Sequence, residues 1–308
     1  MTDITRRTVL QLGVAGAGLA IAPPLFANTS KAAATPEPRQ SLLLDSGWRF
    51  HLGHAADMSK DFGFGRNQRT YAKAGAMTAD AALAAFDDGD WANVQVPHDW
   101  AVTLPFAKPA APAPEKTADA VAAHGFKAIG REFPQNSVGW YRRRLDITSA
   151  DRGKRLWLEF DGVFRDSLVF VNGYIVGRSE SGYAPFRVDI GDFLDYDGGP
   201  NQLTVRVDAS LGEGWFYEGA GIYRSVKLVR AAPVHIPQWG TFVRAEIGTE
   251  GALIKTSVDV NNDSGAGAQV ILRQRILSPD GGLAAKLADV SITLGIDERR
   301  QFDADARI

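Results

Sequence analysis

The sequence predicts an all-β fold built around a hairpin in the middle of the chain. Two apolar runs, residues 167–171 and 174–178, flank the dipeptide Asn172-Gly173. Asn-Gly favours a type I′ turn, because both central residues of that turn need a positive φ. Upstream, residues 156–160 alternate apolar and polar side chains as a half-buried strand does. Short strands so close together are typical of a β-sandwich.

Length and composition limit the classes of function. A chain of 308 residues is too long for one small domain and predicts two. The 34 Lys and Arg nearly balance the 36 Asp and Glu, so no basic field is available to hold nucleic acid. Cysteine is absent, which excludes disulfides and thiolate metal sites. The seven Trp suit either a protein core or a surface that stacks on sugar rings.

Residues 1–34 are expected to be an export signal. Arg6-Arg7 precede an apolar run at 9–22 that is too short and too weakly hydrophobic for a membrane span. Small residues at 32–34 offer a cleavage site. This pattern is typical of a twin-arginine signal, and the alternative is a disordered basic N-terminus. The mature protein is therefore expected to be periplasmic or secreted, with no membrane attachment after signal removal.

The first folded domain is expected at residues 41–231, after a Pro-containing linker at 35–40. A short helix is expected around 78–86, within a stretch that otherwise lacks periodicity. Three adjacent arginines, residues 142–144, are interpreted as a solvated strand face. A Gly-rich aromatic loop covers 212–223 and has no phosphate-loop spacing. Besides those around the hairpin, strands are expected at 41–52, 137–147, 187–190, 203–207 and 224–230, with Leu203, Val205 and Val207 on one face.

The second domain is expected at residues 232–308. Its short strands, separated by turn residues, have the spacing of an immunoglobulin-like sandwich. The Asp-rich tail offers no obvious last strand, so this domain is expected to be incomplete. The predicted strands lie at 240–247, 252–261, 268–277 and 290–294.

Several separated motifs carry a resemblance to glycoside hydrolase family 2, which contains β-galactosidases, β-glucuronidases and β-mannosidases. They follow the family's order over residues 42–308, and the Pro-His-Asp-Trp turn resembles β-galactosidases more than the other two. The motifs are Trp48-Arg49-Phe50, Phe86-Asp87-Asp88, Trp91, Val96-Pro97-His98-Asp99-Trp100, Gly139-Trp140-Tyr141-Arg142, Phe160-Asp161-Gly162-Val163-Phe164, Val171-Asn172-Gly173, Val176-Gly177, Gly182-Tyr183 and Gly219-Ala220-Gly221-Ile222-Tyr223-Arg224.

The resemblance implies a galactose-binding-like jelly-roll domain, then an immunoglobulin-like domain, then a (β/α)₈ barrel. Family members cleave glycosides with retention by two barrel glutamates, a general acid/base and a nucleophile, held ~5–5.5 Å apart. Neither a strand–helix alternation nor an Asn-Glu motif ahead of a buried strand occurs here, so no catalytic residue is assigned. The chain is therefore interpreted as the non-catalytic N-terminal part of an exported β-galactosidase-type hydrolase. Its expected partners are a terminal β-galactoside, the missing barrel and, in a homo-oligomer, further copies of itself.

The resemblance also supplies the candidate site. The position that matches Asp99 carries an Asn or Asp that hydrogen-bonds a sugar hydroxyl, and His98 and Trp100 would shape its loop. Trp215 and Tyr217, in the Gly-rich loop, are further candidates for the pocket wall. The alternative for Asp99 is an ordinary turn residue, and for Trp100 a core residue.

No cofactor and no metal site are expected. Two histidines, His51 and His54, lie three residues apart but lack a third ligand. Two other classes of protein remain open. One is a free-standing carbohydrate-binding module that needs no barrel, and the other is a purely structural pair of sandwiches.

Overall fold

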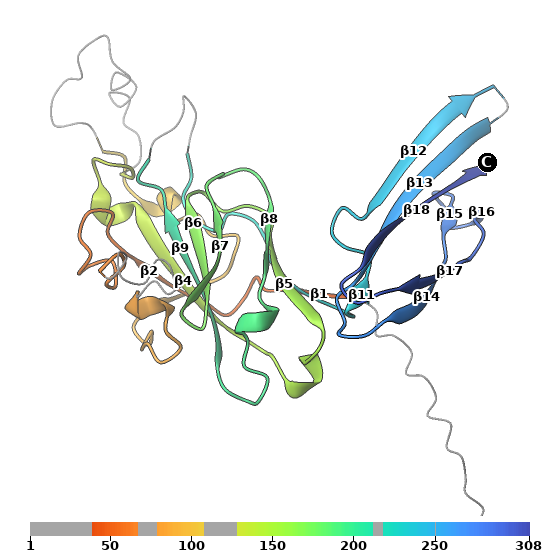
Figure 1. The fold of residues 1–308 in the computed structure, drawn as a ribbon. Coiled ribbons are helices and arrows are strands. Elements are labelled where there is room, and N and C mark those ends of the chain that lie inside the picture. The colour runs from red at the N-terminus through yellow and green to blue at the C-terminus, as the bar shows by residue number, and fades with distance from the viewer. Residues whose placement is uncertain (1–38, 67–78, 108–127, 212–217, 250) are drawn as a thin grey trace, which may run out of the picture. The chain divides into compact units, whose positions relative to one another are not determined.

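The computed structural model describes residues 39–66, 79–107, 128–211, 218–249 and 251–308. The expected export signal, Trp215 and Tyr217 lie outside these ranges. In the described ranges the regular elements are antiparallel strands and single turns of 3₁₀ helix (Figure 1). None of the helical segments there is long and apolar enough to cross a membrane. The all-β prediction is therefore confirmed.

Two sheets in the first part of the chain form a β-sandwich, the predicted jelly-roll type. The larger sheet has the order β3-β2-β4-β9-β6-β7, and the smaller has the order β1-β10-β5-β8. The larger sheet consists of β3 (Ala92–Val94), β2 (Trp48–Leu52), β4 (Val138–Leu145), β9 (Asn201–Asp208), β6 (Ser167–Val171) and β7 (Tyr174–Ser179). The smaller consists of β1 (Gln40–Leu43), β10 (Val226–Ala231), β5 (Arg155–Phe160) and β8 (Phe186–Asp189).

The central strands β4 and β9 are largely buried on both faces, although each contains polar residues. On one face, Tyr141, Val205 and their neighbours join the main core between the two sheets. On the other face, Trp140 and Phe170 pack against the segments that precede and follow residues 67–78. Leu203, Val205 and Val207 do share one face, because side chains alternate along a strand.

Two arginines on the second face of this sheet are buried, each with a carboxylate. Nε of Arg142 donates to Oδ2 of Asp88 at 2.7 Å, and Nε of Arg206 donates to Oδ2 of Asp61 at 2.9 Å. Burial raises the pKa of Asp61, while Arg206 and the indole of Trp140 oppose that effect. The expectation that residues 142–144 form a solvated face is wrong for Arg142, whose side chain is 1% exposed. These ion pairs fasten the segments around Asp61 and Asp88 to the sheet.

The central hairpin is confirmed. Asn172 and Gly173 have φ values of 51° and 89°, as a type I′ turn requires. The side chain of Asn172 also leaves the turn: its Nδ2 donates to the carbonyl of Phe193, and its Oδ1 accepts from the backbone N–H of Gln202, both at 2.8 Å. The Asn in this turn therefore sets the backbone conformation and also holds the next loop.

Four local expectations are wrong, and one of them is the single strand expected at 268–277, which is interrupted at residues 273–274. Residues 41–52 form two strands in different sheets, because the chain turns at Asp45–Gly47 and the Trp48 indole donates back to the carbonyl of Leu44. The helix expected at 78–86 is only a 3₁₀ turn, η2 (Asp80–Ala82). The Asp-rich tail forms a strand, β18 (Arg299–Arg307), whose backbone pairs with a long neighbour along its whole length.

The later strands form the predicted immunoglobulin-like sandwich. One sheet contains β11 (Val234–His235), β12 (Thr241–Gly248), β13 (Gly251–Asn262) and β18, with β13 in the centre. Two short pairs follow, β14 (Ala268–Leu272) with β17 (Val290–Leu294), and β15 (Arg275–Leu277) with β16 (Leu283–Lys286). A small core joins the central sheet to the β14–β17 pair and is centred on Val258, Val260, Leu272, Ile292 and Leu294.

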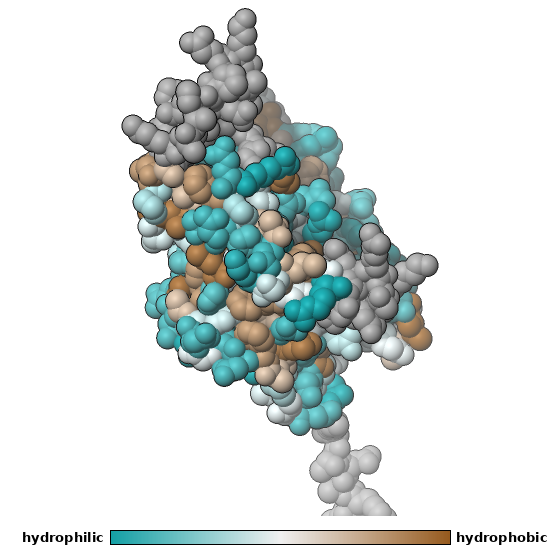
Figure 2. Space-filling model, turned by 90° about the vertical axis from the view of Figure 1, so that its left-hand side faces the viewer, coloured by the Kyte–Doolittle hydropathy of each residue, from teal (hydrophilic) through white to brown (hydrophobic). Residues whose placement is uncertain are grey.

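The surface seen in Figure 2 is mixed in character. Hydrophobic residues occur there in small patches between hydrophilic ones. This is the ordinary composition of a protein surface, so apolar area alone does not identify a binding face.

Candidate functional site

The loop that follows β3 contains Asp99 as the N-cap of a single 3₁₀ turn, η3 (Trp100–Thr103). Its Oδ1 accepts from the backbone N–H of Ala101 at 2.9 Å, as an N-cap carboxylate does. The same oxygen accepts from the backbone N–H of Ala220, also at 2.9 Å. One half-buried carboxylate oxygen therefore joins two segments that are 121 positions apart in the sequence.

Main-chain hydrogen bonds continue this junction on both sides of Asp99. The N–H of His98 donates to the carbonyl of Ile222 at 2.7 Å, and the N–H of Trp100 donates to the carbonyl of Ala220 at 3.0 Å. Gly221 exchanges two hydrogen bonds with Phe164, at 2.8 and 2.9 Å. Three chain segments are thus held together by backbone groups.

The imidazole of His98 is a neutral group inside this junction. Its Nδ1 lies 2.8 Å from Oη of Tyr141, and its ring packs edge-on to Phe50 with centroids 4.7 Å apart. Burial lowers the pKa of His98, and the nearby Asp99 opposes this only in part. Burial also raises the pKa of the Tyr141 phenol well above its usual value. A hydrogen-bonded pair of this kind positions the loop that contains Asp99.

The side chain of Trp100 belongs to the core. It is 3% exposed, its Nε1 donates to the carbonyl of Asn136 at 2.8 Å, and its ring lies 5.6 Å from that of Phe50. The indole ring of Trp100 therefore packs against other side chains and is not available to stack on a sugar. Trp100 could affect a ligand only by positioning the loop that contains Asp99. Of the candidates that the structure describes, Asp99 is the one with a partly exposed carboxylate at the loop surface.

The sequence reasoning missed the partner of this carboxylate. Ala220 supplies only its backbone N–H, and a backbone donor leaves no trace in the residue type. The available signal was the Gly219-Ala220-Gly221 motif, since small residues permit close approach of two chain segments. Trp215 and Tyr217, which precede this motif, lie outside the described residues.

Comparison with known protein families identifies the family of this chain. A family model described as the sugar-binding domain of family 2 glycosyl hydrolases matches residues 44–232. This chain belongs to glycoside hydrolase family 2.

The similar proteins in family 2 include enzymes of two specificities. A β-galactosidase of Bacteroides ovatus, BoGH2A, is 30% identical over 246 residues, which cover 79% of this chain and 24% of that enzyme. A β-glucuronidase of Bacteroides fragilis is 24% identical over 280 residues, covering 86% of this chain and 32% of the enzyme. The crystal structure of a Bacteroides uniformis β-glucuronidase superposes with a TM-score of 0.66 at 25% identity, over 87% of this chain and 28% of that one. This chain therefore spans about a quarter to a third of such relatives.

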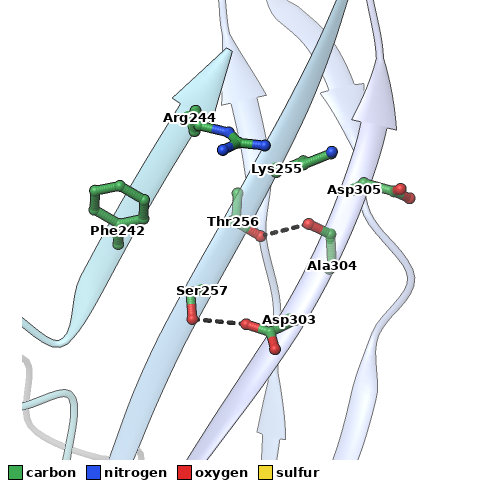
Figure 3. Close-up of a pocket in the computed structure, with 8 residues that line it drawn as sticks. All are labelled: Phe242, Arg244, Lys255, Thr256, Ser257, Asp303, Ala304 and Asp305. Atoms are coloured by element: carbon green, nitrogen blue, oxygen red, sulfur yellow. Dashed lines mark hydrogen bonds between the residues drawn. The ribbon is translucent and has the colours of Figure 1, made fainter. Parts of the chain in front are cut away.

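A hollow in this family 2 chain lies on the β12–β13–β18 sheet (Figure 3). Ser257 donates to Oδ1 of Asp303 at 2.6 Å, and Lys255 donates to Oε1 of Glu246 at 2.8 Å. Most of the polar side chains that line this hollow bond to neighbouring residues of the same sheet, which is typical of a solvated sheet face. Among the described residues, no three His, Asp or Glu side chains are close enough together to hold a metal ion.

Proposed function

We propose that this chain is the N-terminal, non-catalytic part of an exported family 2 glycosidase that hydrolyses terminal β-galactosides. The observation that carries the proposal is the Asp99 junction. Two main-chain N–H donors hold one oxygen of its carboxylate, so the group is fixed in one orientation at the loop surface. A fixed carboxylate suits a sugar hydroxyl, because charge-assisted hydrogen bonds are about twice as strong as neutral ones.

The reaction itself is assigned to a part of the protein outside this chain. By the family resemblance, two glutamates of a barrel would act as general acid/base and nucleophile, and none of the residues here takes those roles. Residues 41–231 would complete the sugar pocket, and residues 232–308 would support the barrel or a homo-oligomer. Export through a twin-arginine signal, to the periplasm or the medium, is part of the same proposal.

β-Glucuronides are the second candidate substrate, because relatives of both specificities match this chain. A glucuronate carries a carboxylate, which the negative charge of Asp99 would repel if the two groups lay near each other. We expect the longest polypeptide that the gene encodes to prefer 4-nitrophenyl β-D-galactoside over the β-D-glucuronide by at least about tenfold in kcat/KM. A reversed preference would replace the first candidate with the second.

The contribution of Asp99 is tested by two substitutions in that polypeptide. Asp99→Asn keeps an oxygen that can accept from both N–H groups, and its Nδ2 can still donate to a sugar hydroxyl. It exchanges a charge-assisted hydrogen bond for a neutral one, so we expect kcat/KM for the galactoside to fall by less than about tenfold. Asp99→Ser keeps an N-cap oxygen but shortens the side chain and removes the charge. Loss of one charged hydrogen bond, about 1.5–3 kcal/mol, corresponds to a roughly 10–100-fold lower kcat/KM for the galactoside.

Thermal unfolding of the three proteins provides the control, because the shorter side chain of Asp99→Ser keeps the N-cap bond but gives up the one to Ala220. A lower kcat/KM counts for the proposal only if the variant unfolds at the same temperature as the wild type. If Asp99→Ser hydrolyses the galactoside as well as the wild type does, Asp99 is a turn residue only. The free-standing module remains the alternative. It would show galactose binding by calorimetry with this chain alone and no hydrolysis by the longest polypeptide.

A further inference from the structure

The jelly-roll sandwich has a hollow that the proposed function does not use. It is open, has a volume of about 570 Å³, and lies between the β6–β7 turn and the loop that leads to β9. This is within the usual size range of small-ligand sites. The lining residues are Arg152, Asn172, Tyr174, Asp192, Phe193, Leu194, Asp195, Tyr196 and Asp197.

The hollow is far from the Asp99 junction. Strand β9 begins at this hollow with Asn201, which pairs with Leu145 at the end of β4. The other end of β9 is Asp208, which pairs with Val138 at the start of β4. Asn136, two residues before Val138, accepts the hydrogen bond from Trp100, so this end of the sheet is the one next to the Asp99 loop. An eight-residue strand is about 24 Å long. A ligand at this hollow would therefore bind separately from one at Asp99.

Aromatic rings form the apolar part of the hollow. Tyr174 is 50% exposed although it lies on a strand, and its ring centroid is 5.9 Å from that of Phe193. The ring of Tyr196 is half-buried, and its hydroxyl donates to the carbonyl of Gly191 at 2.9 Å. The guanidinium of Arg152 lies 5.4 Å from the centroid of that ring. A half-exposed tyrosine supported by other rings offers a flat apolar face to a ligand.

The walls are fixed by buried hydrogen bonds. Asn201 is 3% exposed; its Oδ1 accepts from the N–H of Asp195, and its Nδ2 donates to the carbonyl of the same residue, both at 2.7 Å. Nδ2 of Asn172 donates to the same Oδ1 at 3.1 Å and to the carbonyl of Phe193 at 2.8 Å. The hairpin turn and the loop are therefore tied to each other, so the hollow exists before any ligand binds and little ordering entropy is lost on binding.

The polar groups at the rim are mainly hydrogen-bond acceptors. Asp192, Asp195 and Asp197 outnumber the single cation, Arg152, which is itself bonded to Asp197 at 2.6 Å. Burial and nearby carboxylates raise the pKa of the Tyr196 phenol, so it remains protonated at neutral pH. Such a rim accepts hydrogen bonds from hydroxyl groups and repels anions.

We propose that this hollow is a second carbohydrate site that binds one neutral pyranose unit of a glycan chain. The apolar face of the sugar would stack on Tyr174, and its hydroxyls would donate to the carboxylates at the rim, chiefly Asp192. The excess negative charge excludes uronic acids and sulfated sugars. The open shape lets the glycan continue in both directions, so the site would hold the protein on a polymer.

The test is native gel electrophoresis of this chain in gels that contain a soluble neutral glycan: galactan, arabinogalactan or xyloglucan. We expect at least one of them to retard the wild type, and Tyr174→Ala to weaken the retardation constant at least tenfold. Asp192→Asn should weaken it less. The matched control is Tyr183→Ala, which removes a tyrosine of similar exposure, 55%, that does not line the hollow.

Circular dichroism of each variant checks that it is folded, and Tyr174 is exposed enough for its removal to be tolerated. Absence of retardation by all three neutral glycans, equal retardation of Tyr174→Ala and the wild type, or retardation by polygalacturonate alone would overturn the proposal. Loss of retardation in EDTA would also overturn it, because the acidic rim would then be a cation site. The assay involves no hydrolysis, so its failure is distinct from a failure of the proposed function.

Discussion

Replacing Arg142 with methionine is expected to lower the free energy of unfolding by about 3–5 kcal/mol, the usual cost of breaking a buried ion pair. The guanidinium is almost fully buried and donates to Asp88 at 2.7 Å, and to the carbonyls of Ala81, Leu83 and Phe86. Methionine fills much of the space but satisfies none of these acceptors. Chemical denaturation, followed by tryptophan fluorescence, measures the change.

Arg144→Met is the matched control for this prediction. Arg144 is two residues further along the same strand, is exposed, and donates to the carbonyl of Ala84 at 2.8 Å. We expect its loss to cost less than about 1 kcal/mol, as is typical of exposed charged groups. Equal effects of the two substitutions would show that segment 79–88 is not held by Arg142.

Gly221→Ala is expected to lower the free energy of unfolding by about 2–4 kcal/mol and to disturb the Asp99 junction. Gly221 has a φ of 122°, which side-chain-bearing residues rarely adopt. A Cβ there would also lie well inside van der Waals contact with the carbonyl oxygen of His98 and with Oη of Tyr141. Overpacking costs about 1–3 kcal/mol, and the backbone strain adds about 1 kcal/mol. Denaturation measures the stability, and galactoside hydrolysis by the longest polypeptide measures the effect on the site.

The control for the backbone strain alone is Gly153→Ala. Gly153 also has a positive φ, 81°, but no atom lies within 4 Å of the position that its Cβ would occupy. We therefore expect a loss of about 1 kcal/mol. If Gly221→Ala costs no more than Gly153→Ala, the junction between residues 98–100 and 220–222 is looser than its hydrogen bonds indicate.

Much of the fold could be predicted because the relevant signals are local. The Asn172-Gly173 turn needs only the backbone preference of two residues, and β9 follows from the alternation of Leu203, Val205 and Val207 with polar residues. The division of residues 41–52 between two sheets was not predictable, since it depends on which strand each half pairs with. The strand β18 was missed for a similar reason, because its polar residues give no apolar alternation and its pairing is set by β13.

The candidate site was only partly predictable. The sequence identified Asp99 through a short motif, but its second anchor is a backbone N–H of Ala220, which no residue pattern encodes. Arg142 was wrongly predicted to be solvated, because it is one of three adjacent arginines. Its burial depends on residues 79–88, which are distant in the sequence and cover this part of the sheet. Charged residues in a sequence do not reveal whether a partner will bury them.

The most direct test of the account compares hydrolysis of 4-nitrophenyl β-D-galactoside by two purified proteins, residues 35–308 and the longest polypeptide that the gene encodes. We expect turnover only by the longer protein, because no catalytic residue is assigned to this chain. Turnover by residues 35–308 alone would contradict the account, and it would place the catalytic carboxylates within this sequence.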